Sequence, residues 1–167
     1  MVSYKTIIED IKTLVDKHKM IESFGTGDIT QLIYLTQEIK GQDNTTNKAP
    51  LYPLLYVIPQ NVTRNEQFIV YDFNILICDV MNAKNYDIET QLLSDTLQIA
   101  EDVLAQFKYS VTAQQGDYED KYDIILPTTL TSFTERFDDI LVGWNFTLRI
   151  TADIPLNRCI APYNDFN

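Results

Sequence analysis

Residues able to do chemistry are few in this 167-residue chain, and they are scattered along it. His18 is the single histidine, and it stands between Lys17 and Lys19 near the end of a helical pattern. A Ser/His/Asp or Cys/His arrangement would need this imidazole as its general base. We expect it instead to be a cation near a helix C-terminus, where positive charge is stabilised.

The two cysteines, Cys78 and Cys159, each stand among hydrophobic residues. With one histidine they cannot complete a tetrahedral zinc site unless carboxylates help. Because Met1-Val-Ser-Tyr-Lys5 leads directly into an amphipathic helix pattern, we expect no secretory signal peptide. We therefore expect reduced, buried thiols, with a disulfide between them as the alternative.

Gly25-Thr-Gly27-Asp28 resembles a fragment of a phosphate-binding loop. Such a loop follows a strand and continues into Lys-Ser/Thr or a third glycine, because its amides and lysine hold the phosphates. The sequence predicts no strand before Gly25 and has neither continuation. A turn between two elements is the better interpretation, and no cofactor is expected.

Three pairs of acids are sequence neighbours: Glu9/Asp10, Glu101/Asp102 and Asp138/Asp139. Neighbouring side chains diverge, whereas a general acid and a general base must converge in one cleft with separated pKa values. Asp79, near the end of a long strand pattern, is the best single candidate for a buried acid, although a role in the following turn explains it more simply. Arg136 is expected to pair with an acid such as Asp138, or with a partner chain. We expect no enzyme, and no catalytic, cofactor-binding or metal-binding residues.

The composition predicts one folded, acidic domain over residues 1–167. Hydrophobic residues make up 45% of the chain, and 24 acids against 13 bases give a net charge of -11. Proteins that bind nucleic acid need clusters of Lys and Arg, and the sequence has none. The acidity favours solubility, a basic protein partner, or a wall that repels phosphates. The longest apolar runs are far below the ~18 residues that span a bilayer.

Helical periodicity predicts three helices, at Ser3–Lys19, Ile29–Ile39 and Asp87–Phe107. Ser3, Asp28 and Asn85 are the expected N-caps. The second segment is ambiguous, since Leu32–Leu35 also fits an extended conformation. The third helix has an apolar stripe composed of Ile88, Leu92, Thr96, Ile99, Val103 and Phe107.

Strands are predicted at Leu51–Ile58, Glu66–Met81, Ile124–Leu126, Leu130–Ile140 and Val142–Ile154. Pro59–Asn65 is predicted as a hairpin loop, and exposed loops are expected near 41–50 and 114–123, with a tail at 155–167. Two strands alternate clearly, with one face formed by Ile69, Tyr71, Phe73, Ile75 and Ile77 and by Trp144, Phe146, Leu148 and Ile150. The longer of these is apolar on both faces over part of its length, which predicts cover from its own helices or from a neighbouring subunit.

This order predicts an α+β fold: a mostly antiparallel sheet of four to five strands, packed on one face by one long and one or two shorter helices. Several segments then resemble the neck and tail-completion proteins of tailed bacteriophages, in particular tail-terminator-like ring proteins. The segments are Leu51-Tyr-Pro-Leu-Leu-Tyr-Val57, Tyr71-Asp-Phe-Asn-Ile-Leu-Ile-Cys-Asp79, the long helix with Glu89 and Ser94-Asp95, and Phe133-Thr-Glu-Arg-Phe-Asp-Asp139 with Gly143-Trp144. The resemblance extends from about Phe24 to Cys159.

The resemblance implies a structural virion protein, made in the host cytoplasm. It implies a hexameric or dodecameric homo-oligomer ring between the portal-side connector and the tail, with a channel through which DNA passes unbound. It implies no catalytic residue and no membrane partner. The polar loop Gly41–Pro50 and the acidic segment Gln114–Asp123 depart from the family pattern. The alternative is an acidic soluble adaptor or inhibitor that acts through protein–protein contacts, DNA mimicry among them.

Overall fold

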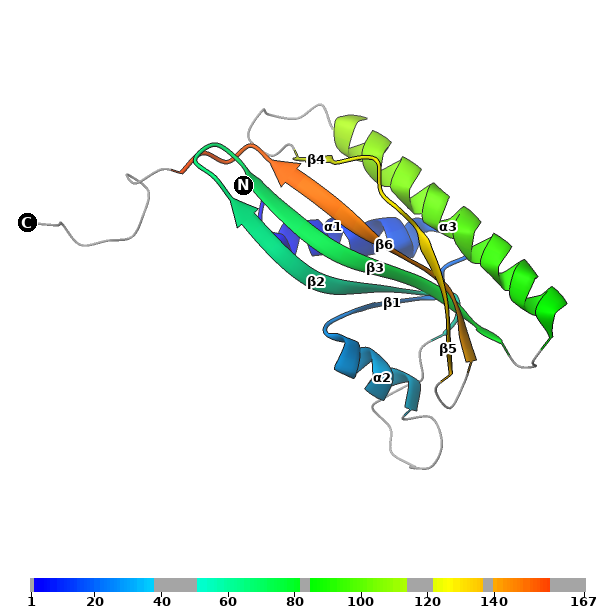
Figure 1. Cartoon of the computed structure of the whole chain (residues 1–167). Helices are drawn as coiled ribbons and strands as arrows, with labels where there is room; N and C mark the ends of the chain where they lie inside the picture. The colour runs from blue at the N-terminus through cyan, green and yellow to red at the C-terminus, as the bar shows by residue number, and fades with distance from the viewer. Residues whose placement is uncertain (1, 38–50, 82–84, 114–121, 137–139, 157–167) are drawn as a thin grey trace, which may run out of the picture.

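A computed structural model describes residues 2–37, 51–81, 85–113, 122–136 and 140–156 of the chain (Figure 1). In chain order the elements are α1 (Tyr4–Lys17), β1 (Ser23–Thr26), α2 (Ile29–Gln37), β2 (Leu54–Arg64), β3 (Ile69–Met81), α3 (Tyr86–Ala113), β4 (Tyr122–Ile124), β5 (Thr131–Arg136) and β6 (Ile140–Ala152). The predicted α+β fold is confirmed.

The strands form one mixed sheet in the order β1-β2-β3-β6-β4, and β5 also pairs with β6. β4 lies opposite Ile150–Ala152 and β5 opposite Ile140–Asn145, so the two together form one interrupted edge strand. β1 runs parallel to β2, and the other pairs are antiparallel. The described residues thus contain six strands, where the sequence predicted four to five.

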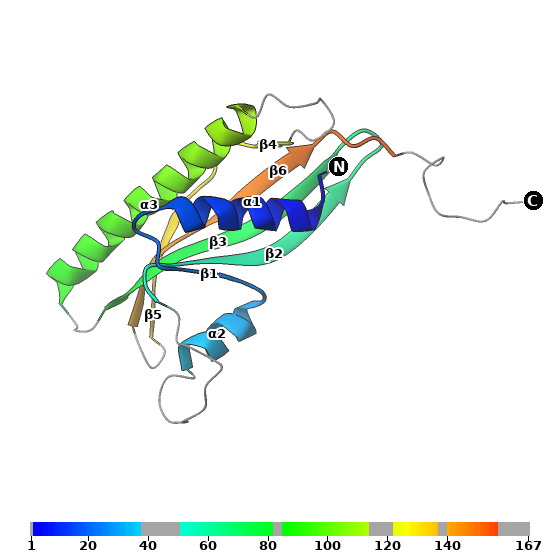
Figure 2. The same ribbon diagram turned by 180° about the vertical axis from the view of Figure 1, so that it is seen from behind.

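The helices cover both faces of the sheet, which corrects the prediction of helices on one face. α1 and α3 lie on the first face, and α2 lies on the second (Figures 1 and 2). α3 has 28 residues and is therefore about 42 Å long, as long as β3 and β6. The prediction of one long helix with shorter ones is correct.

The main core lies between the first face and the helices α1 and α3. Its helical members are Ile7, Ile11, Val15, Ile99, Ala100, Val103 and Phe107, and its strand members include Leu55, Val57, Phe73, Ile75, Ile77, Phe146, Leu148 and Ile150. The predicted alternation of β3 and β6 is therefore correct. Trp144 faces the same way, since its indole Nε1 donates to the carbonyl of Leu93 on α3 at 2.8 Å. In the predicted α3 stripe Thr96 is also buried, whereas Ile88 is exposed.

A smaller core lies under α2 on the second face. It consists of Leu32, Leu54, Tyr56, Leu76, Cys78 and Leu141. This cluster explains why β3 is apolar on both faces in its second half. α2 covers this half of the sheet, and the other half of the second face is polar.

Several strand assignments differ from the prediction, and three of them matter for the surfaces described below. β2 does not end at Ile58 but continues through the expected loop to Arg64, with a bulge between Pro59 and Val62. β1 occupies the segment predicted as a turn before α2. β4 starts at Tyr122, and Ile125 and Leu126 lie outside it.

The predicted helix caps are correct. The amide of Thr6 donates to the Ser3 hydroxyl, and the amide of Gln31 donates to Asp28 Oδ1. Asn85 Oδ1 accepts from the amide of Asp87. The loop at 41–50, residues 114–121 of the acidic loop, Asp138, Asp139, Cys159 and the tail from 157 lie outside the described residues.

Candidate interaction surfaces

His18 joins the two helices of the first face. It is the C-cap of α1, and its Nδ1 accepts a hydrogen bond of 3.2 Å from the amide of Met20. Its Nε2 lies 3.6 Å from Oδ2 of Asp102 on α3. The imidazole therefore holds α1 against α3, and no nucleophile is among these contacts.

The Gly25–Asp28 segment packs against Tyr56. A Cβ on Gly25 would lie 2.5 Å from the buried Tyr56 ring, and Gly27 has φ 153°, which side-chain-bearing residues rarely adopt. Asp28 caps α2 through the amide of Gln31. Close packing against Tyr56 thus accounts for glycine at position 25, and the backbone conformation accounts for glycine at position 27. Neither glycine needs a phosphate-binding role to explain it.

Asp79 lies on the first face of β3, towards α3. Its Oδ1 accepts from the amide of Val80 at 2.7 Å. Burial raises the pKa of the Asp79 carboxyl, the Val80 hydrogen bond lowers it, and the charge of Asp95 raises it further. The carboxyl thus has a structural partner within β3, and residues 82–84 of the turn in which a role was expected lie outside the described residues.

The remaining predicted acids do not converge. Asp10 accepts from the Tyr122 hydroxyl, and Glu9 lies 3.6 Å from the Lys5 ammonium. Within the described ranges, no group of three or more His, Cys, Asp and Glu side chains is arranged to hold a metal ion. The side chain of Arg136 lies outside the described part of the structure.

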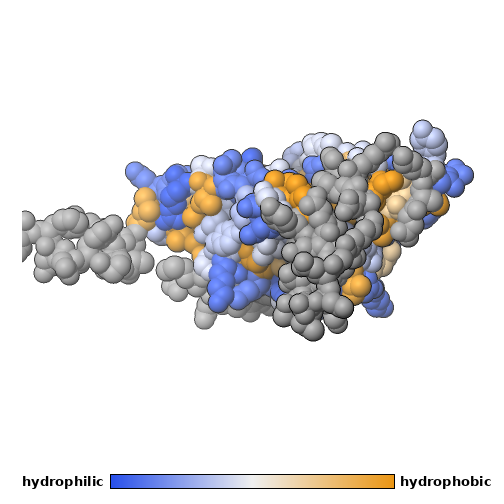
Figure 3. Space-filling model, turned by 90° about the horizontal axis from the view of Figure 1, so that it is seen from below, coloured by the Kyte–Doolittle hydropathy of each residue, from blue (hydrophilic) through white to orange (hydrophobic). Residues whose placement is uncertain are grey.

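Exposed apolar side chains gather at the tip of the β2–β3 hairpin. The hairpin surface, as we define it, consists of Val62, Phe68 and Leu156. Val62 is 55% exposed and Leu156 is 64% exposed. The amide of Leu156 donates to the carbonyl of Glu66 at 2.8 Å, which fixes the segment after β6 against the hairpin. Hydrophobic side chains are visible at this end of the molecule in Figure 3.

A second exposed apolar site lies on the opposite edge of the sheet. The link surface consists of Ile125 and Leu126, between β4 and β5, and Leu126 is 52% exposed. The amide of Ile125 donates to the carbonyl of Arg149 at 2.9 Å. The Thr128 hydroxyl donates to the carbonyl of Thr147 at 2.8 Å. The link therefore stays attached to β6 where the regular ladder is interrupted.

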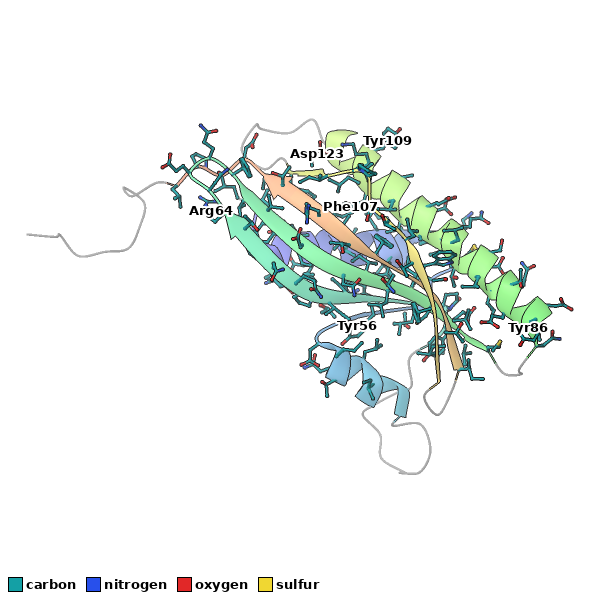
Figure 4. The ribbon with its side chains drawn as sticks, viewed as in Figure 1. Tyr56, Arg64, Tyr86, Phe107, Tyr109 and Asp123 are labelled. Atoms are coloured by element: carbon teal, nitrogen blue, oxygen red, sulfur yellow. The ribbon has the colours of Figure 1, made fainter. Side chains whose placement is uncertain are left out.

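Both ends of α3 also expose aromatic rings. Tyr86, 87% exposed, lies at the start of α3, and Tyr109 lies near its end (Figure 4). Neither ring belongs to the core clusters, so both are available for contacts outside the subunit.

Two segments of the sheet edges, those that contain Val62 and the link surface, are free of charge. Charged residues make up 22% of the chain, yet Leu51–Thr63 and Ile124–Thr134 contain none. Native proteins usually protect edge strands with charged side chains, because an unprotected edge pairs with other chains. This lack of charge is the signal in the sequence that could have identified the two segments. Residue types alone could not separate Val62 and Leu126 from core residues.

Neither a scan of known protein families nor a search of curated proteins finds a match for this chain. None of the helices in the described residues is both long and apolar enough to cross a membrane.

Proposed function

We propose that the chain is the subunit of a homo-oligomeric ring in the neck or tail of a tailed bacteriophage. The ring joins the portal-side connector to the tail and leaves an axial channel for DNA. The observation that carries the proposal is that exposed apolar side chains lie on two different edges of one sheet, with Val62 of the hairpin surface on the β2 edge and the link surface on the edge formed by β4 and β5. This role requires surfaces and no catalytic group.

Two different surfaces on opposite edges favour assembly into a ring. A two-fold dimer buries the same patch on both subunits, whereas a head-to-tail contact buries two different patches and closes into a ring when the rotation permits. A dimer formed through one surface would leave the other exposed on each subunit. Repeated head-to-tail contact buries both surfaces on every copy.

The open half of the second face suits a wall past which DNA slides. Its centre is the cross-strand ion pair between Asp72 Oδ1 and Arg149 Nε, 2.8 Å apart. Asn74 and Thr147 lie beside it and carry no charge. Among the described strand residues of this face, Arg149 is the only cation, and Asp72 already neutralises it. With a net charge of -11 per copy, phosphates gain little from contact with such a wall.

The acidic adaptor is less well supported, because several acids that a DNA mimic would display have partners within the chain. Glu89 accepts from the Thr134 hydroxyl, and Asp95 accepts from the Gln91 amide. Asp102 lies beside His18. A mimic needs rows of solvated carboxylates in place of phosphates.

Electron microscopy of the purified protein, with a DNA-binding assay, tests the proposal. We expect closed rings with an axial opening and six or twelve copies. A fluorescent 20-base-pair duplex should show no anisotropy change in 50 mM salt, where phosphate contacts are strongest. A monomer at every concentration, or tight binding of the duplex, would contradict the proposal.

A further inference from the structure

We propose that the sheet continues from each copy into the next: the outer edge of β2 pairs antiparallel with β4 and the link of a neighbouring copy. This inference rests on the proposed ring and names the strands that form its contact. It follows from the extent of each edge, the direction of the strands and the distribution of charge.

The outer edge of β2 is open over more than half of its length. β1 pairs only with Leu54–Val57, and the last backbone bond to that side joins the Gly27 amide to the Val57 carbonyl. From Ile58 to Arg64, the described residues provide no strand on this side (Figure 1). Pro59 is the one residue there that lacks an amide donor, so most of the edge can accept a strand.

The opposite edge is open at the same level of the sheet. Val62 lies opposite Tyr71, and Tyr71 lies opposite Ile150. Ile124 of β4 lies on the other side of Ile150. Val62, Tyr71, Ile150 and Ile124 are therefore successive partners in one row that crosses four strands, and Val62 and Ile124 are its two ends. The described residues place no strand beyond either end.

The directions of the two edge strands suit an antiparallel contact. β2 and β6 are both antiparallel to β3, so they run the same way, and β4 runs against β6. β2 and β4 consequently run in opposite directions. When a second copy is placed beside the first in the same orientation, its β4 meets β2 as an antiparallel neighbour. Antiparallel pairing is slightly the more stable form per residue.

Charge identifies the occupant as a second copy. A chain with a net charge of -11 repels its own copies, so contact between copies requires surfaces free of acids. The two open edges come close to this condition. From Leu54 to Thr63, β2 carries no charge. Asp123 is the one acid of β4, and the Lys108 ammonium of α3 already pairs with its carboxylate.

The number of strands is consistent with an open channel. Four strands cross the sheet at the level of Val62, namely β2, β3, β6 and β4. Six copies would place about 24 strands around the axis, and closed barrels of 16 to 18 strands already enclose a water-filled channel. The polar half of the second face would then be the inner wall, with α1 and α3 outside.

Disulfide trapping tests the pairing. In a Cys159→Ser background, Val62→Cys protein is mixed with Ile125→Cys or Leu126→Cys protein and oxidised. Cys78 is buried and stays outside the reaction. Val62 and the buried Ile124 end the same row. Side chains alternate along an extended chain, so Leu126 lies on the side of Ile124 and Val62, and Ile125 lies on the other side. The Leu126→Cys mixture is therefore the one expected to react. We expect a disulfide-linked dimer in this mixture, and none when each variant is oxidised alone.

The other outcomes separate this inference from the proposed function. Linkage of Val62→Cys to itself means a two-fold β2–β2 contact and overturns the inference. Rings without any mixed disulfide overturn the strand pairing and leave the ring standing. A monomer by sedimentation overturns both.

A charge substitution gives a second readout. Gln60→Glu should weaken assembly about ten-fold, because it places an acid on the open edge of β2 that receives the neighbouring copy. Gln60→Asn should retain assembly. Gln98→Glu, on an exposed position of α3, adds an acid away from the contact and serves as the matched control. Equal effects of Gln60→Glu and Gln98→Glu would contradict the proposed contact at β2.

Discussion

The phenolic hydroxyl of Tyr122 on β4 donates a hydrogen bond of 2.7 Å to Oδ2 of Asp10 on α1, 112 residues earlier in the chain. The Tyr122 ring also packs against Phe107 of α3, with the ring centroids 5.7 Å apart. A three-residue edge strand is thus attached to both helices of the first face. If β4 receives β2 of another copy, this attachment fixes the acceptor strand before assembly.

Replacing Tyr122 with Phe should lower the free energy of unfolding by about 1 to 2 kcal/mol. The variant keeps the ring and removes a hydrogen bond to a carboxylate, and such bonds contribute about this much. Urea denaturation measures the change. Tyr109→Phe, which removes an exposed hydroxyl, is the control and should have no effect. Equal stability of Tyr122→Phe and the wild type would mean that solvent replaces the bond without cost.

Stability should fall at alkaline pH, in part because of Cys78. Burial, with a smaller effect of the Asp79 charge, raises the pKa of the Cys78 thiol from 9.0 to about 12. The unfolded chain therefore releases this proton first, and stability present below pH 9 is lost as pH rises towards 12. The loss approaches about 1.4 kcal/mol per pH unit for one proton.

Cys78→Ala should remove the part of this pH dependence that comes from the thiol. The cavity that the substitution leaves also lowers the free energy of unfolding at every pH. Val142→Ala truncates another buried strand residue and keeps the thiol, so it should keep the slope. Urea denaturation between pH 8 and pH 11 compares the three proteins. Identical slopes in all of them would show that the thiol does not titrate differently on unfolding.

Asp79→Asn should increase stability at neutral pH. Burial is the main cause that raises the pKa of the Asp79 carboxyl, so the folded state disfavours its charge. Its stabilising contribution is present below the unfolded value of 3.8 and is lost as pH rises through the folded pKa. Asparagine retains the acceptor for the Val80 amide without the charge. We expect a gain below about 1 kcal/mol, because solvent screens a half-buried carboxyl.

The gain from Asp79→Asn should shrink as pH falls below 4, where the wild-type carboxyl is protonated. Thermal unfolding at pH 7 and pH 3.5 measures both effects. Asp153→Asn, at an exposed position just after β6, is the control for removing one acid from an acidic chain. A loss of stability in Asp79→Asn at pH 7 would mean that the charge has a favourable partner.

Gly143→Ala should destabilise the subunit by about 3 kcal/mol or more. A Cβ at this position would lie 1.9 Å from the carbonyl oxygen of Ile77 and 2.7 Å from the Cα of Cys78. Both atoms belong to the backbone of β3 and cannot move aside as a flexible side chain would, so the added methyl forces the strands apart. Thr147→Ala, at an exposed position of β6, should be nearly neutral in the same denaturation experiment.

Segments in which hydrophobic residues recur with a clear period were correctly predicted to form the core. Short segments, or segments of mixed composition, were not predicted correctly. The alternation of Ile69–Ile77 and of Trp144–Ile150 identified the first face, because side chains of a strand point to opposite faces in turn. β1 has four residues and includes Gly25, too few for a period to appear. Its position depends on the Tyr56 ring, which touches the site where a Cβ would stand.

The extension of β2 could not be predicted from its own residues. Pro59 and Asn61 are typical of turns, and Gln60 and Thr63 beside them are polar. Pairing with β3 holds them in a strand, and the bulge between Pro59 and Val62 accommodates the proline. The candidate surfaces depend on this extension and on the interruption between β4 and β5. Neither the extension nor the interruption produces a periodic pattern in the sequence. The sequence therefore indicated that interaction surfaces exist, but it did not identify their residues.

Native mass spectrometry of the wild-type protein tests the ring most directly. We expect a closed assembly with six or twelve times the 19.3 kDa mass of one chain, and no further growth as the concentration rises. A species that remains at 19.3 kDa, or that stops at two copies, would contradict it.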